Sequence, residues 1–273
     1  MILRNPFRLT CLSALLGALL TGAGIAGPLD DAYQAKILPG WRTDDGRHMA
    51  ALQIDLAPGW KTYWRAPGDA GIPPRFDWRG SSNLSDVQVI WPTPDVMDQG
   101  GMQVIGYGGK LIVPLHVHPK SRARDVRLNA QIEIGVCKDV CLPVTVKVDQ
   151  DLPRDTYKPD AIIAGALANQ PYSAQEARVG QVSCAISPIQ DGLRLTAKVQ
   201  MPAISAGEVA VIETDNAQVW VSQAKTTRSG NQLTAVSDLY HVEGRSFALN
   251  RSAVRITVIG ATHAVDIQGC TAG

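Results

Sequence analysis

The segment from Val126 to Val148 constrains the fold more than any other part of this 273-residue chain. From Val126 to Ile134, apolar residues occupy every second position and polar residues lie between them, which is typical of a strand with one buried face. The same alternation returns from Val144 to Val148. Two such strands joined by a short loop predict a β-hairpin. Cys137 and Cys141 then stand at the two sides of its turn.

Short strand patterns separated by turn residues dominate the remainder of the chain, and helical periodicity is almost absent. The one helix that we expect covers Ala161 to Asn169, and the breaker-rich segment from Ala66 to Pro74 is expected to be a loop. Besides the hairpin, the pattern predicts strands over 49–56, 61–64, 75–78, 87–91, 111–117, 181–187, 193–199, 208–213, 218–222, 254–259 and 264–267.

This arrangement predicts an all-β fold of two immunoglobulin-like β-sandwich domains joined by a short, partly helical connector. We expect the first sandwich to cover residues 27–153, the connector 154–180 and the second sandwich 181–273. The second region has about the size of one immunoglobulin-like unit.

The first residues predict export from the cytoplasm. Arg4 and Arg8 precede an uncharged run over 9–26 that ends in small residues, which is typical of a signal peptide over 1–26. A retained membrane anchor is the alternative, because the run is near the lower length limit for a membrane span. The formal net charge is +1, so no basic field indicates a nucleic-acid partner.

Four cysteines follow the expected signal peptide, and in an oxidising compartment an even number suggests disulfide bonds. Sequence position favours Cys137 with Cys141 and Cys184 with Cys270 among the three pairings. Closing the long loop between Cys184 and Cys270 stabilises a fold by roughly 4.6 kcal/mol on chain-entropy grounds, which suits a structural disulfide. The five-residue ring of the other pair contributes only about 2 kcal/mol, so a redox role suits it better.

Three interpretations of the Cys137 and Cys141 pair stay open on spacing alone. One is a redox switch, for which the strand phase places both sulfurs on the face opposite the core, within reach of a partner. The second is an inert disulfide that clips a surface hairpin. The third is a Cu(I) site, because thiolates with a nearby histidine or methionine suit that soft ion; the nearby residues of those types are His116, His118, Met97 and Met102.

The sequence around these cysteines resembles the amino-terminal periplasmic domain of the thiol:disulfide interchange protein family DsbD, in the version found in the ScsB (suppressor for copper sensitivity) relatives. The motif Gly135-Val-Cys-Lys-Asp-Val-Cys-Leu-Pro143 carries the resemblance, together with the stretches 73–84, 91–101, 106–109 and 111–114. The resemblance covers about residues 41–153 and implies an immunoglobulin-like fold. It also implies a relay of reducing equivalents from a membrane-embedded thiol carrier and thioredoxin-like proteins to periplasmic oxidoreductases.

By position, the resemblance implies that Cys141 forms the mixed disulfide with a partner and that Cys137 resolves it. The segment 95–101 occupies the place of the family's cap loop, with the aromatic tip absent. We expect Met97 or Met102 to cover the sulfurs instead, with Asp95 and Asp98 as loose matches to the family's acidic residues.

The sulfur pair itself carries two electrons, so we expect no organic cofactor. The printed chain contains neither the family's multi-span membrane region nor its thioredoxin domain, so we expect a free-standing periplasmic relay.

Overall fold

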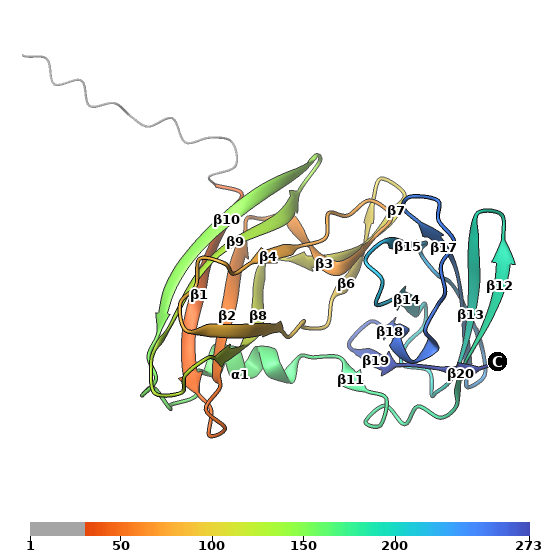
Figure 1. Cartoon of the computed structure of the whole chain (residues 1–273). Helices are drawn as coiled ribbons and strands as arrows, with labels where there is room; N and C mark the ends of the chain where they lie inside the picture. The colour runs from red at the N-terminus through yellow and green to blue at the C-terminus, as the bar shows by residue number, and fades with distance from the viewer. Residues whose placement is uncertain (1–30) are drawn as a thin grey trace, which may run out of the picture.

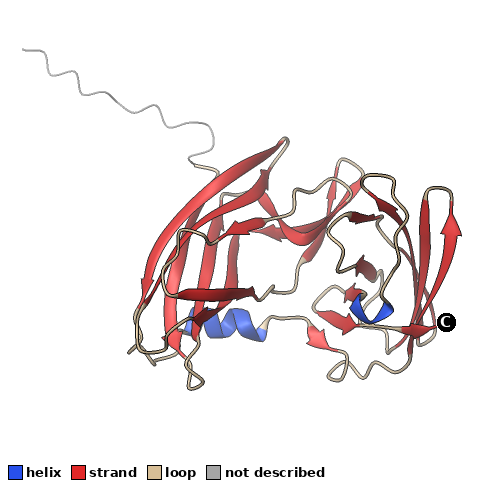
Figure 2. Ribbon diagram, viewed as in Figure 1, coloured by secondary structure: helices blue, strands red, loops and turns tan. Residues whose placement is uncertain are grey.

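The fold is built almost wholly from β-strands, arranged as four sheets in two pairs (Figures 1 and 2). The structure is a computed structural model that describes residues 31–273, so the expected signal peptide over 1–26 lies outside the described residues. The all-β prediction of two immunoglobulin-like sandwiches joined by a partly helical segment is confirmed. The domain boundaries at 153 and 181 stay predictions.

The first pair of sheets contains the amino-terminal strands. One sheet has the order β1 (Tyr33–Arg42), β2 (His48–Leu56), β8 (Lys110–Pro119) and β5 (Leu84–Val89). The other has the order β10 (Cys141–Leu152), β9 (Val126–Cys137), β3 (Lys61–Gly68), β7 (Met102–Gly108) and β6 (Asp95–Gln99), with β4 (Arg75–Asp77) also paired to β9. Their inner faces share one apolar core, which the alternating residues of β9 enter from one side.

The second pair of sheets is built in the same way from the later strands. One sheet has the order β11 (Tyr172–Ser173), β19 (Ala264–Gln268), β18 (Arg255–Ile259) and β14 (Val209–Glu213). The other has the order β15 (Val219–Val221), β17 (Gln232–His241), β13 (Gly192–Gln200), β12 (Val182–Ile189) and β20 (Thr271–Ala272), and β16 (Lys225–Ser229) pairs with β17. A short 3₁₀ turn, η1 (Arg251–Ala253), precedes β18.

The predicted helix is present as α1 (Ala161–Ala168) between the two pairs of sheets. The side chain of Asp160 accepts hydrogen bonds from the backbone N–H groups of Ile162 and Ile163, which caps the helix. Ile163 is fully buried against Met49 and Ala51 on the outer face of the first sheet. The segment is therefore packed against the first sandwich. Within residues 31–273, no helix is long and apolar enough to span a membrane.

The two halves are in direct contact. Ile259 and Ala264 of the second half belong to the apolar core of the first. In addition, the guanidinium group of Arg65 in β3 donates two hydrogen bonds of 2.9 Å to the carboxylate of Glu213 in β14. The same guanidinium lies 4.0 Å from the centre of the Trp64 ring, a cation–π contact. An apolar contact and a partly buried ion pair thus join β3 to the second half.

One local prediction was wrong. The segment 66–74 is not all loop, because β3 continues to Gly68, which pairs with Val104 after a register shift. The segment 95–101, expected at the place of the cap loop, is mostly strand. Its first five residues form β6, which pairs with β7 through a turn at Gly100 and Gly101, both of which have positive φ.

Candidate functional site

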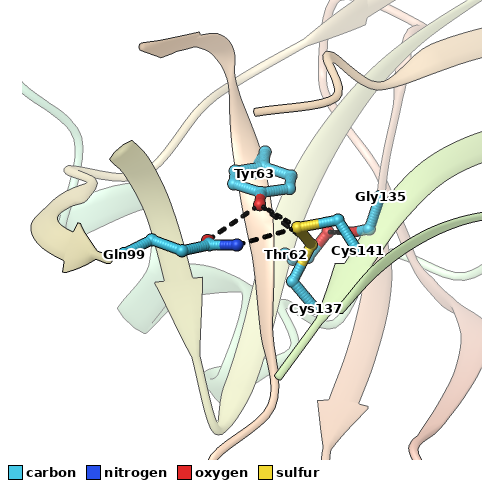
Figure 3. The surroundings of a disulfide bond; sticks show 6 residues. All are labelled: Thr62, Tyr63, Gln99, Gly135, Cys137 and Cys141. Carbon is cyan, nitrogen blue, oxygen red and sulfur yellow. Dashed lines mark hydrogen bonds between the residues drawn. A yellow bond between two sulfur atoms is a disulfide. The ribbon is translucent and has the colours of Figure 1, made fainter. Parts of the chain in front are cut away.

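The hairpin of β9 and β10 places the two cysteines directly opposite each other. Cys137 is the last residue of β9, Cys141 is the first of β10, and the register pairs them with a Cα–Cα distance of 4.2 Å. They form a disulfide bond at the tip of the hairpin (Figure 3). The strand ladder continues from this pair to Leu152 and Val126 without a shift, so the disulfide ends a long, regular hairpin.

The Tyr63 hydroxyl lies against both sulfurs (Figure 3). Its oxygen is 2.8 Å from Cys137 Sγ and 2.9 Å from Cys141 Sγ. Tyr63 belongs to β3, the neighbour of β9, and its side chain is 2% exposed. A bonded sulfur carries no proton, so the hydroxyl is the donor toward the disulfide.

Gln99, the last residue of β6, completes this polar contact (Figure 3). Its side-chain amide nitrogen donates to Cys141 Sγ at 2.9 Å, and its amide oxygen accepts from the Tyr63 hydroxyl at 3.1 Å. The hydroxyl has one proton to share between Gln99 and the sulfurs. Any change at the sulfurs therefore changes the hydrogen bonding of Tyr63 and Gln99 together.

A small apolar cluster surrounds the disulfide on the outer face of the sheet. Tyr63, Val104 and Cys137 are its buried members, and partly buried residues pack around them: Ala70, Ile72, Met97 and Cys141. This second core is separate from the main one, which lies on the opposite face of β9. It excludes water from one sulfur of the pair while the other lies at its edge.

The two cysteine residues differ in exposure. Cys137 is 0% exposed, whereas Cys141 is only partly buried. The predicted strand phase was correct, since Cys137 is on the face opposite the core residues Ile134 and Val136. The prediction that both sulfurs are reachable was wrong for Cys137, because Tyr63 and the residues around it cover that face.

Gly135 makes room for this cover. A Cβ atom at position 135 would lie 2.7 Å from Ile72 Cβ and 2.8 Å from Tyr63 Cδ2, both too close for ordinary contact. The Thr62 hydroxyl donates a buried 2.8 Å hydrogen bond to the Gly135 carbonyl, which joins β3 and β9 at the same level. The bare glycine thus allows the tyrosine ring to approach β9 closely, two residues before Cys137.

Burial raises the pKa of the Tyr63 hydroxyl above its usual value of 10.0, and its hydrogen bond with Gln99 acts in the opposite direction. The phenol therefore stays protonated at neutral pH. It remains a hydrogen-bond donor to whichever sulfur species is present.

The residues predicted for the cap segment occupy different positions. Met97 is partly buried in the cluster around the disulfide, whereas Met102 is 47% exposed at the turn after β6. Asp95 and Asp98 are both exposed, and Asp98 accepts a hydrogen bond from Gly101 in the turn. The side chain of this segment that touches a sulfur is Gln99, which the sequence analysis did not single out.

Tyr63 was also missed by the sequence analysis. Its strand was predicted, but Tyr63 and Trp64 are both large aromatic residues, so the pattern did not show which of them faces the cysteines. In the structure Trp64 enters the main core, and Tyr63 faces the disulfide.

The histidines considered for a Cu(I) site lie in a different sheet from the cysteines. His116 and His118 belong to β8, and their rings are 5.1 Å apart, near the turn between β1 and β2. Over residues 31–273, no group of three or more His, Cys, Asp or Glu side chains is arranged to hold a metal ion.

The other disulfide joins the beginning and end of the second half. Cys184 in β12 bonds to Cys270, 86 residues later, with a Cα–Cα distance of 5.7 Å. Cys184 is fully buried, and β20, which follows Cys270, pairs with β12. The bond thus has the position in the fold that was expected from the sequence for a structural disulfide.

A known protein family matches the part of the chain that contains this site. Residues 31–153 match the family model described as "Thiol:disulfide interchange protein DsbD, N-terminal". These residues form a DsbD amino-terminal domain. The DsbD domain contains the whole β9–β10 hairpin, Tyr63 and Gln99, so the described site lies within it. The resemblance named from the sequence is confirmed.

The fold is similar to the crystal structure of the N-terminal periplasmic domain of ScsB from Proteus mirabilis. The two share 20% sequence identity with a TM-score of 0.62, over 88% of this chain and 92% of that one. This coverage extends the similarity beyond the DsbD domain into the second half. A protein of unknown function from Porphyromonas gingivalis W83 aligns over 87% of this chain and 99% of its own, at 11% identity, but its TM-score of 0.21 is too low to indicate a shared fold. No curated protein matches the chain in sequence.

Proposed function

We propose that the protein relays reducing equivalents by thiol–disulfide exchange through Cys137 and Cys141. One observation carries the proposal: the disulfide at the hairpin tip has one sulfur sealed inside a cluster and one at its edge, and both contact the same hydroxyl. Such asymmetry gives the two sulfurs different roles. Cys141 exchanges with partners, and Cys137 is the internal resolving cysteine.

Reduction of the protein starts with a thiolate of a reduced donor. It attacks Cys141 Sγ, the bond between Cys141 and Cys137 breaks, and the bonding electron pair leaves on Cys137 as a thiolate. The second thiolate of the donor then attacks the donor sulfur of the mixed disulfide, and Cys141 leaves as a thiolate. The donor leaves oxidised, and the protein leaves as a dithiol that has gained two electrons and two protons.

Delivery of the electrons follows the same steps in reverse. The Cys141 thiolate attacks the disulfide of an oxidised acceptor and forms a mixed disulfide. Cys137 then attacks Cys141 Sγ and releases the acceptor as a dithiol. One cycle transfers two electrons and restores the disulfide, so no organic cofactor is required.

Tyr63 supports the charge that appears on Cys137. When the disulfide is attacked, negative charge develops on a sulfur that has no contact with water, and the Tyr63 hydroxyl is already 2.8 Å away. A hydrogen bond to a charged group is stronger than one to a neutral group. The buried hydroxyl therefore stabilises the leaving thiolate more than it stabilises the disulfide.

The β6–β7 hairpin acts as a cap that a partner displaces. Met97 packs on the cysteine cluster, and Gln99 touches Cys141, the sulfur that a partner must reach. Asp95, Asp98 and Met102 lie on its exposed side and contact the partner during displacement.

The partners are a membrane-embedded thiol carrier or a thioredoxin-like donor on one side and periplasmic oxidoreductases on the other. The DsbD family match supports partners of the thioredoxin type in general. The similar ScsB domain is described as periplasmic, and this supports the same compartment for the present chain.

Trapping of a mixed disulfide tests the relay. A Cys137→Ala variant whose Cys141 carries a thionitrobenzoate leaving group, incubated with a reduced thioredoxin-like protein that retains only its attacking cysteine, should form a covalent complex through Cys141 that persists until a reductant is added. The matched Cys141→Ala variant should accumulate little, because Cys137 is buried. Equal trapping by both variants, or none by either, contradicts the assigned roles.

A further inference from the structure

A pocket of about 390 Å³ lies at the opposite end of β9 from the disulfide. It is lined by the turn after β1, the loop between β8 and β9, and the segment that follows β10. Since β9 has twelve residues, the two sites are separated by the length of an extended strand, about 35 Å. The pocket is therefore distinct from the redox site, and the proposed exchange chemistry does not use it.

Arg42, the last residue of β1, is the buried residue of this pocket. It is 4% exposed, and its Nη2 atom donates a 2.7 Å hydrogen bond to the Arg122 carbonyl. Its Nη1 atom is buried and has no hydrogen-bond partner. Within the described part of the chain, no carboxylate forms an ion pair with Arg42. A permanently charged guanidinium that is buried in this way lacks the counter-charge that such groups normally have.

Two further guanidinium groups line the same pocket from separate segments. Arg122 lies across the turn at Gly46, where a Cβ atom would be only 2.6 Å from Arg122 Cδ, so the bare glycine lets this side chain pass over the turn. Arg154 follows β10, and one of its guanidinium nitrogens donates to the Ala123 carbonyl. Neither arginine forms an ion pair among residues 31–273. Three arginines thus line one pocket from three segments.

Two carboxylates, those of Asp44 and Asp155, also line the pocket. Both side chains are exposed, and neither lies within 4.0 Å of a guanidinium nitrogen of the three arginines. They reduce the positive charge of the pocket to a formal excess of one without occupying the free donor of Arg42. They repel an incoming anion, so removing one of these carboxylates should raise the affinity for it.

We propose that this arginine pocket binds a phosphate group, carried by a free phosphate compound or by an anionic lipid head group. Guanidinium groups match the oxygen atoms of phosphate, and three arginines from separate segments give the pocket the positive charge that a phosphate needs. Bound phosphate supplies the counter-charge that the buried guanidinium of Arg42 lacks. The pocket is larger than one phosphate, so the group is part of a larger molecule or is bound with water.

Binding of inorganic phosphate and of vesicles tests the proposal on the purified protein. Calorimetric titration with phosphate, against chloride at matched ionic strength, measures the free anion. Co-sedimentation with phosphatidylglycerol vesicles, against phosphatidylcholine vesicles, measures the head group. Either form of binding should weaken about tenfold or more in Arg42→Gln and Arg122→Gln, because each removes a positive charge from the pocket. Asp155→Asn should tighten it several-fold, because a repulsive charge is removed.

Arg122 and Asp155 are exposed, so their variants keep the test valid if Arg42→Gln fails to fold. Arg245→Gln is the matched control. It removes one positive charge from an exposed pair with Glu243 in the second half and should leave binding unchanged. Phosphate binding that the pocket variants abolish supports a free ligand, and vesicle binding alone that they abolish supports a head group. No binding in either experiment, or binding that the pocket variants leave unchanged, overturns the proposal.

Discussion

The hydroxyl oxygen of Tyr63 lies 2.8 Å from Cys137 Sγ, the sulfur that is closed off from solvent. If this hydroxyl stabilises the leaving thiolate, Tyr63→Phe should slow reduction of the disulfide. A hydrogen bond to a charged group contributes about 1.5–3 kcal/mol, which corresponds to a rate loss of roughly tenfold or more. Stopped-flow measurement of reduction by a dithiol checks this. Tyr107→Phe is the control, because that hydroxyl donates to the Pro92 carbonyl and does not touch the sulfurs. An unchanged rate in Tyr63→Phe contradicts the role.

Removing the Gln99 side chain should expose Cys141. Its amide nitrogen is 2.9 Å from Cys141 Sγ, so Gln99→Ala takes away a polar contact and part of the cover. We expect reduction by a small thiol to become several-fold faster, since access to the attacked sulfur is improved. Gln103→Ala, on the paired strand β7, is the matched control because it has no contact with either sulfur. Equal acceleration in both variants would indicate a general loosening of the hairpin.

Gly135→Ala should destabilise the fold at the redox site. The added methyl group would lie 2.7 Å from Ile72 Cβ and 2.8 Å from Tyr63 Cδ2, and overpacking of this kind costs about 1–3 kcal/mol. Urea unfolding measures the loss. Gly165→Ala provides the opposite control, because position 165 lies in α1 with nothing within 4 Å, and alanine there should stabilise by up to about 1 kcal/mol. If Gly135→Ala leaves the free energy of unfolding unchanged, the Tyr63 ring moves freely enough to accommodate the added methyl group.

The two disulfides should contribute unequally to stability. Replacing Cys184 and Cys270 together by alanine opens a long loop, for which chain entropy predicts a loss of about 4.6 kcal/mol. Replacing Cys137 and Cys141 together opens a five-residue ring, worth about 2 kcal/mol on the same basis. Urea midpoints of the two double variants, with their slopes, compare the losses. A larger loss at the hairpin would make that disulfide the structural one.

Stability should fall as the pH is lowered from 7 toward 5, in part because of His48. Burial lowers the pKa of this side chain below its usual value of 6.5, and the hydrogen bond to the Pro39 carbonyl opposes that effect. The unfolded chain therefore binds a proton more readily than the folded one. The contribution is fully present above pH 6.5 and is lost as the pH falls toward the folded-state pKa.

The surroundings of the His48 ring explain why its pKa is lowered. The Nδ1 atom of His48 is buried without a hydrogen-bond partner, so a proton added there is not stabilised. His48→Gln should flatten the pH dependence of the urea midpoint between pH 7 and 5. Burial also lowers the pKa of His116, so some dependence of the same sign should remain. A variant with the same slope as the natural protein contradicts the assignment to His48.

The sequence pattern predicted most strands but missed β17, although its buried and half-buried residues alternate without a break. Ser237 and His241 occupy inward positions of this strand, and polar residues there hide the apolar period. Arg42 hides the end of β1 in the same way, because a buried arginine looks like a surface residue in the sequence. Alternation predicts a strand only where its inward residues are apolar.

The β9–β10 hairpin, the phase of its cysteines, their pairing and the second disulfide were determined by the sequence itself. These features depend on neighbouring residues and on a period of two, which the chain displays locally. The cover on the disulfide was decided only by the tertiary structure. Tyr63 and Gln99 lie 74 and 38 residues before Cys137, and nothing near them in sequence shows that β3 and β6 bring both side chains to one sulfur pair. Burial of Cys137 follows from that long-range packing, and so does the difference between the two sulfurs.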